Sequence, residues 1–288
     1  MRARAVGGLA LGVLAISWGA PLARLTNAAP LAIAGWRMIL ATALLLVLAL
    51  VRGRRLLASD HRPGATLAGV FLGAHFGLWV PSLWLTSVSA SVVLVSTAPL
   101  FVLLASPRFL GVPIRRRNVA SLVLALTGIA LIAWGDVQIS PRALVGDALA
   151  LAGAAAECGY LVIGKRLRRR VALDQYLTVV YGVAALTLAA VVLAAGVEPL
   201  PDDRISWLPL LGMAVGPTLL GHGSLNWALA HLEAYQVNLA VLLEPVLASV
   251  WAWLILAEVP PFHVVPGAIL VIGALALEVG ARGQRTTG

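Results

Sequence analysis

Charged side chains are scarce in this chain. Only 11 % of its 288 residues are Asp, Glu, Lys or Arg, whereas 60 % are hydrophobic. An ordinary soluble domain carries about 25 % charged residues. The composition therefore excludes such a domain and indicates a protein that lies within a lipid bilayer.

Other features are also missing. One cysteine, Cys158, excludes a disulfide framework. The sequence contains no HExxH, GxSxG, aspartate-rich metal motif or Walker motif, which counts against an enzyme and against ATP-driven transport by this chain alone. We therefore expect no catalytic residues, no metal and no cofactor.

Long apolar runs are what the chain has in abundance. Each is of the length, some 17 to 25 residues, that crosses the hydrocarbon core as a helix, and their unbroken character argues against the alternating pattern of a membrane β-barrel. The sequence predicts an all-α polytopic membrane protein of ten transmembrane helices, near residues 6–22, 30–50, 65–85, 91–109, 118–135, 145–163, 175–196, 207–230, 235–256 and 261–280.

The net charge of +9 is distributed unevenly between the two sides of the predicted membrane. Seventeen of the 21 Lys and Arg residues fall on the side of the N-terminus and three on the other, with Arg37 inside a span. An excess of cations marks the cytoplasmic side. We expect a multi-pass protein of the cell membrane with both termini cytoplasmic, in contact with lipid head groups and with no nucleic-acid partner.

The two halves of the sequence share several residues at matching positions. Pro99 in "STAPLFVLLAS" matches Pro245 in "LLEPVLASVWAW", and Gly128 falls close to Gly273. We divide the chain into residues 1–140 and 141–288, with five helices each. Because five is odd, the second repeat is inverted, an arrangement that places a substrate site at mid-membrane where the repeats meet.

Several stretches resemble the EamA-like family of the drug/metabolite transporter superfamily. They include "SWGAPLARLTNAAPLAIAGWRMILA", "GDALALAGAAAECGYLVIGKRLR" and "LNWALAHLEAYQVNLAVLLEPVLASVWAWLILAE". The resemblance implies a carrier with two five-helix repeats, a central cavity and alternating access. It matches Arg37 and Glu244–Pro245 to residues common in the family. Glu258 matches the acidic residue after the ninth span, but Gly111 stands where the first repeat would have its counterpart.

Polar and aromatic residues inside the predicted spans are the candidates for substrate binding. In the third span His75, Trp79 and Ser82 share one helical face, and His222, Asn226 and Trp227 form a similar set in the eighth. The candidate set is completed by Trp18 and Tyr160. The alternative is that these groups satisfy neighbouring helices.

Two intramembrane acids, Glu157 and Glu244, are candidates for proton coupling. A structural ion pair with Arg37 is the first interpretation of Glu244, and a proton or substrate role is the alternative. Pro99, Asn238 and Pro245 are candidates for gating or helix packing.

The favoured hypothesis is a secondary active transporter of small organic metabolites such as amino acids. Export is the favoured direction. The alternative is an integral-membrane transferase acting on a lipid-soluble substrate. The expected partners are a small-molecule substrate and the lipid bilayer, and a homodimer is left open.

Overall fold

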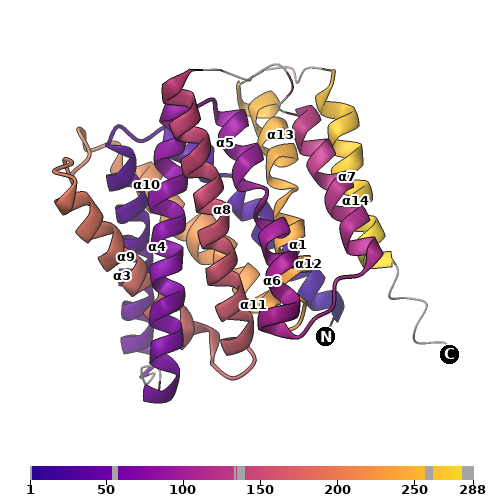
Figure 1. Cartoon of the computed structure of the whole chain (residues 1–288). Helices are drawn as coiled ribbons and strands as arrows, with labels where there is room; N and C mark the ends of the chain where they lie inside the picture. Colours follow the sequence, from indigo (N-terminus) through magenta and orange to yellow (C-terminus); the bar gives the residue numbers. More distant parts are fainter. Residues whose placement is uncertain (1, 54–57, 133, 135–139, 257–261, 281–288) are drawn as a thin grey trace.

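The chain folds into a bundle of helices that run roughly parallel to one another (Figure 1). The computed structural model describes residues 2–53, 58–132, 134, 140–256 and 262–280. Within them, ten helical spans follow one another, of which six are single helices and four are interrupted. Single helices are α3 (Pro30–Val51), α4 (Arg62–Leu85), α7 (Arg116–Ile132), α8 (Pro141–Leu167), α9 (Leu173–Ala194) and α14 (Val264–Gly280).

The four interrupted spans are made of shorter helices. They are α1 (Arg2–Ile16) with α2 (Gly19–Arg24), α5 (Val88–Val95) with α6 (Ala98–Leu110), α10 (Trp207–Met213) with the π-helix η2 (Ala214–His222) and α11 (Gly223–Leu229), and α12 (Ala234–Val241) with α13 (Glu244–Leu256). A short 3₁₀ turn, η1 (Ser59–His61), precedes α4.

Length and apolar composition support the membrane assignment. Six segments of the described chain are long and apolar enough to span a bilayer: Arg4–Arg24, Pro30–Val51, Arg62–Leu85, Ala90–Leu110, Pro141–Leu167 and Leu173–Ala194. Two shorter apolar helices cover Ala234–Leu247 and Val264–Glu278. The predicted all-helical membrane fold is confirmed. The first helix begins and the last helix ends at the same end of the bundle (Figure 1). We call this the arginine-rich end, because it carries Arg115–Arg117 and Lys165–Arg170.

The fourth and ninth spans break at matching places. In each, an eight-residue helix is followed by a 13-residue helix whose second residue is proline, Pro99 in α6 and Pro245 in α13. The matching prolines of the sequence indicate interrupted spans at these two places, although the ranges given for the spans, 91–109 and 235–256, are unbroken. Proline has no N–H to donate and is tolerated in the first turn of a helix, so each proline begins a new helix in mid-span.

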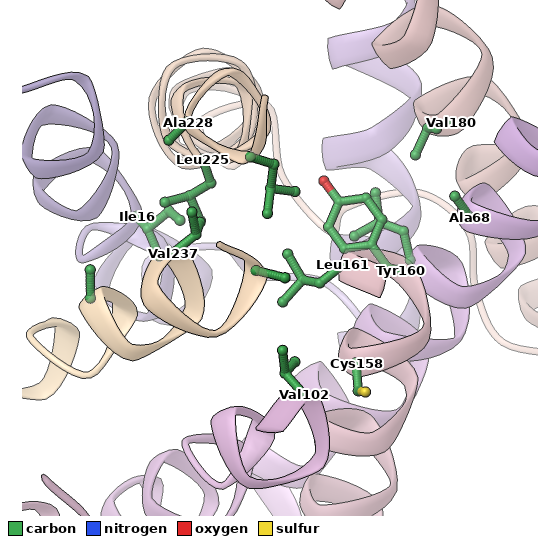
Figure 2. Close-up of a cluster of buried hydrophobic side chains, with 14 of the residues drawn as sticks. Ile16, Ala68, Val102, Cys158, Tyr160, Leu161, Val180, Leu225, Ala228 and Val237 are labelled. Atoms are coloured by element: carbon green, nitrogen blue, oxygen red, sulfur yellow. The ribbon is translucent and has the colours of Figure 1, made fainter. Parts of the chain in front are cut away.

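Most of the apolar interior of the bundle belongs to one large cluster, and a second, small cluster is formed by Ala23, Ile33, Leu210 and Met213. Ile16 of α1, Val102 of α6, Leu161 of α8, Leu225 of α11 and Val237 of α12 converge in the large cluster (Figure 2). These side chains are buried, and their removal from lipid and water holds residues from distant parts of the sequence around one centre.

Two helices, α7 and α14, form a tightly packed pair at one edge of the bundle (Figure 1). Glycines permit the close approach: a Cβ atom on Gly128 would lie 2.6 Å from the carbonyl oxygen of Gly267, and a Cβ atom on Gly267 would lie 2.6 Å from that of Gly128. Small residues at membrane-helix interfaces bring backbones together in this way.

We predict that Gly128→Ala lowers the thermal stability of the protein. The added methyl group forces the pair apart, and overpacking of this kind costs about 1–3 kcal/mol. Gly273→Ala is the matched control, because its Cβ atom would meet Leu124 at an ordinary 3.7 Å. Unfolding in detergent should occur at a lower temperature for Gly128→Ala only. Equal midpoints for the two variants would show that the pair is loosely packed.

Candidate functional site

A small cavity lies at the centre of the bundle, where the broken spans meet. Its volume is about 40 Å³, far below the several hundred Å³ of a pocket that holds a metabolite-sized ligand. In this structure the cavity is too small to hold such a ligand, and in that sense we call the structure closed. The lining residues are Ile16, Gly19, Arg37, His75, Phe76, Trp79, Val95, Ser96, Pro99, Glu157, Pro217, His222, Leu225, Asn238, Val241, Leu242 and Glu244.

Arg37 of α3 is the buried cation of the cavity, with only 2 % of its surface exposed. Its Nε donates a hydrogen bond to Thr218 Oγ1 at 3.1 Å. Its guanidinium lies over the ring of Phe76, 4.1 Å from the centroid, where the negative face of the ring attracts a cation. The charge thus has partners from α4 and η2.

His75 and Glu157 bring α4 and α8 together at the cavity wall. His75 Nδ1 lies 3.0 Å from the carbonyl oxygen of Gly153 and 3.9 Å from Glu157 Oε2. Gly153 makes this approach possible, because a Cβ atom there would lie 3.3 Å from the Cβ atom of Trp79. The His75 ring also stacks on Trp79, with centroids 5.9 Å apart.

Among the residues that the structure describes, three polar atoms of the lining have no hydrogen-bond partner. They are Trp79 Nε1, His222 Nδ1 and Asn238 Nδ2, all buried. Buried polar groups are nearly always bonded, and in a membrane the surrounding lipid cannot supply the missing partner. These three residues of the lining therefore retain unused hydrogen-bonding capacity.

Two half-helices begin at the cavity. Ser96 and Pro99 at the start of α6, and Glu244 at the start of α13, belong to the lining. A helix N-terminus carries a partial positive charge, which favours the carboxyl group of Glu244. The expected direct ion pair between Glu244 and Arg37 is not among the ion pairs of the described residues; instead both side chains face the same cavity.

Three of the expected substrate-binding residues lie one layer outside the cavity. Asn226 Nδ2 donates to Tyr160 and to the carbonyl oxygen of His222, and the Tyr160 hydroxyl points toward α11 (Figure 2). Ser82 is bonded to Ser91 across α4 and α5 at 2.6 Å. These residues hold the lining helices in place.

Two of the three expected tryptophans, Trp18 and Trp227, also lie away from the lining. Trp18 stands at the break between α1 and α2 and packs on Trp251, with centroids 4.8 Å apart. Trp227 packs against His231 at 4.8 Å and borders a separate hollow near Arg52. The reason is helical geometry: Leu225 faces the cavity, and a residue two positions further on points to nearly the opposite side.

Sequence reasoning missed Phe76 and Thr218. Phe76 touches Arg37, His75 and His222 at once, with ring centroids 4.7 and 5.3 Å from the two histidines, but an aromatic residue in an apolar helix is indistinguishable from core. Thr218 lies in the π-helix around Pro217, and the Gly- and Pro-rich stretch "GMAVGPTLLGHGS" was its only signal.

The family pattern has an acidic residue at two positions, occupied here by Gly111 and Glu258, and the structure describes the first of them. Gly111 ends α6 in the left-handed conformation, with φ 66°, which an acidic side chain adopts at a cost. Glu258, the expected acid after the ninth span, lies outside the described residues.

A closed polar cavity inside a bundle of membrane-spanning helices, with half-helices ending at it, is the architecture of a membrane transporter. The profile of the EamA-like transporter family matches residues 5–134 and 144–279. The chain belongs to this family, and its two matching segments imply a duplicated arrangement. The resemblance inferred from the sequence is confirmed, and the alternative of a membrane transferase is wrong.

Two proteins of similar sequence are likewise named as transporters. The chain is 23 % identical to the uncharacterized transporter YdfC of Bacillus subtilis, over 93 % of this chain and 87 % of that protein. It is 26 % identical to a riboflavin transporter of Brucella anthropi, over 84 % and 85 % of the two chains. A solved crystal structure matches over 100 % of both chains with a TM-score of 0.81 and 18 % identity, which shows the shared fold.

We predict that Thr218→Val destabilises the protein. The substitution keeps the shape of the side chain but leaves the Arg37 guanidinium without its hydroxyl partner, and loss of a hydrogen bond to a charged group costs about 1.5–3 kcal/mol. Thr178→Val is the matched control, because that hydroxyl is buried and bonds only to the carbonyl oxygen of Asp174 in its own helix. Thermal unfolding in detergent should separate the two, and equal midpoints would contradict the role of Thr218.

Proposed function

We propose that this chain is a secondary active transporter that exports a small zwitterionic metabolite, such as an amino acid, by alternating access around the central cavity. The observation that carries the proposal is a closed mid-membrane cavity in which unpartnered polar atoms lie beside groups of opposite charge. Such groups are costly in a membrane and are kept for function.

The charges of the lining favour a zwitterion. The lining carries Arg37, Glu157 and Glu244 beside its aromatic residues. A substrate carboxylate is matched by the guanidinium and by the N-terminus of α6. A substrate ammonium is matched by the two carboxyl groups. The rings of Phe76 and Trp79 supply an apolar wall for a side chain.

We assign roles according to whether a residue lines the cavity or lies one layer outside it. We assign direct substrate contact to His75, Trp79 and His222, and positioning of the lining helices to Ser82, Tyr160 and Asn226. Glu157 and Glu244 are the proton-coupling candidates. The repeats are residues 1–140 and 141–288, and the arginine-rich end faces the cytoplasm. The riboflavin transporter of Brucella anthropi makes riboflavin the second solute to test.

We predict that Glu244→Gln uncouples transport from a pH gradient. Purified protein in proteoliposomes, supplied with a mixed amino-acid pool and separately with riboflavin, should move a solute faster when a pH gradient is imposed. The variant cannot bind or release a proton at this position and should lose that stimulation. Flux is measured by mass spectrometry of the trapped solutes.

Glu198→Gln is the control for this experiment. Its carboxylate lies in the loop after α9 and accepts a hydrogen bond from Leu200 N, away from the cavity. It should respond to the gradient like the wild type. Equal stimulation in Glu244→Gln would make Glu244 a packing residue, and the absence of flux for every solute would contradict the proposed substrate class.

We predict that Trp79→Phe raises the KM of the transported solute. The variant keeps an aromatic ring but loses the unpartnered Nε1 donor, and one hydrogen bond is worth roughly a fivefold change in affinity. Trp36→Phe is the control, because Trp36 Nε1 donates to the carbonyl oxygen of Pro199 outside the cavity. An unchanged KM in Trp79→Phe would place the substrate elsewhere.

A further inference from the structure

A cluster of polar side chains joins three helices at the arginine-rich end. Glu278 of α14, only 2 % exposed, accepts hydrogen bonds from Asn118 Nδ2 at 3.1 and 3.0 Å, from Ser121 Oγ at 3.4 Å and from Gln236 Nε2 at 3.4 Å. Arg117 Nη2 lies 3.8 Å from Glu278 Oε1. The proposed transport function uses none of these groups.

Tyr235 completes the cluster from α12. Its hydroxyl donates to the carbonyl oxygen of Asn118 at 2.8 Å and lies 2.8 Å from Ser121 Oγ. Two helices of the cluster, α7 and α14, already form the tight glycine-packed pair. The polar side chains therefore attach α12 to that pair. We call Asn118, Ser121, Tyr235, Gln236 and Glu278 the latch.

The helix that the latch holds is bordered by three hollows. Asn238, Val241 and Leu242, at and just beyond the end of α12, line the central cavity. Tyr235 and Gln236 line a polar hollow of about 20 Å³ together with Arg115 and Glu278. A third, apolar hollow of about 180 Å³ lies between α12, α1 and α14, with Leu239, Ala240 and Leu243 in its wall.

The surroundings of α12 give it room to move. Six of the eight residues of α12 are buried, but a hollow of about 180 Å³ borders the helix on the side of α1 and α14. An interruption of the helix at Leu242–Leu243 separates α12 from α13. Apolar residues such as Val237 and Leu239 pack in the core, and Tyr235 and Gln236 add polar attachments, which can bond to water once they part. This combination is typical of a closure that opens.

We propose that α12 is the gate of the transporter at the arginine-rich end, and that the latch centred on Glu278 keeps this gate closed. When the latch breaks, α12 moves into the neighbouring hollows and connects the central cavity, at Asn238, to the polar hollow at Arg115. The proposal rests on the proposed transport function, because a gate has meaning only where a solute passes.

The test measures access to the cavity without any transported solute. In a Cys158→Ala background, which has no cysteine, Val95→Cys places a thiol in the cavity wall on α5. The rate at which a membrane-impermeant maleimide labels this thiol is measured in inverted and in right-side-out membrane vesicles. Glu278→Gln should raise the rate from the arginine-rich face by roughly tenfold, because loss of bonds to a charged group shifts an equilibrium by about that factor or more.

Two further variants make the result decisive. Tyr235→Phe removes the other attachment of α12 and should raise labelling from the same face. Ser106→Ala is the matched control, because Ser106 lines the same polar hollow but bonds only to the carbonyl oxygen of Val102 in its own helix; its labelling rate should equal that of the parent. Rates for Glu278→Gln and Tyr235→Phe that equal the control, or that rise only from the opposite face, would overturn the proposal. Increased labelling without flux of any solute would contradict the transport function while still showing that breaking the latch opens a route to the cavity.

Discussion

The lack of water in a bilayer core is the constraint on which this structure depends, because each polar group inside it must find its partner within the protein. Arg37 shows the consequence most clearly. Its guanidinium lies between the Phe76 ring and the Thr218 hydroxyl, and Tyr181 of α9 donates to the carbonyl oxygen of Thr218 at 3.1 Å. One cation thus positions α3, α4, η2 and α9, and the π-helix that presents Thr218 is a distortion of the kind often found at functional sites.

The same constraint is satisfied differently at the end of the bundle and at its centre. At the arginine-rich end, Lys165 Nζ donates to the carbonyl oxygens of Leu229 and Leu232, and Arg168 Nε donates to that of Asn226, so cations of α8 cap the C-terminal end of α11, where the helix carries partial negative charge. At the centre, Trp79, His222 and Asn238 keep unpartnered atoms. Hydrogen bonding is thus extensive between α8 and α11, whereas residues of the cavity lining retain atoms with no hydrogen-bond partner, as Arg117 and Tyr176 also do outside the cavity.

The sequence predicted the helical membrane fold, because long apolar runs have few alternatives in lipid. It also identified most polar members of the cavity, such as His75, Glu157 and His222, since an ionisable residue in a span is rare and conspicuous. It could not place Phe76, whose role arises from the helices that face it, nor separate Asn226 from the lining, because a π-helix alters the register between neighbouring turns. It overlooked Glu278, whose partners come from α7 and α12, far away in sequence. Local sequence patterns do not show which residues of distant spans come into contact.

The matching breaks in the fourth and ninth spans give the bundle two equivalent short helices, α5 and α12, at opposite ends (Figure 1). They are not equally attached. Among the described side chains, Ser91 of α5 bonds to Ser82 of α4, whereas α12 is attached through Tyr235 and Gln236 to a network that includes a buried carboxylate. Hydrogen bonds to a charged group are stronger than those between hydroxyls. The two short helices therefore differ in the polar side chains that attach them, and the network that we propose as a latch is the one that attaches α12.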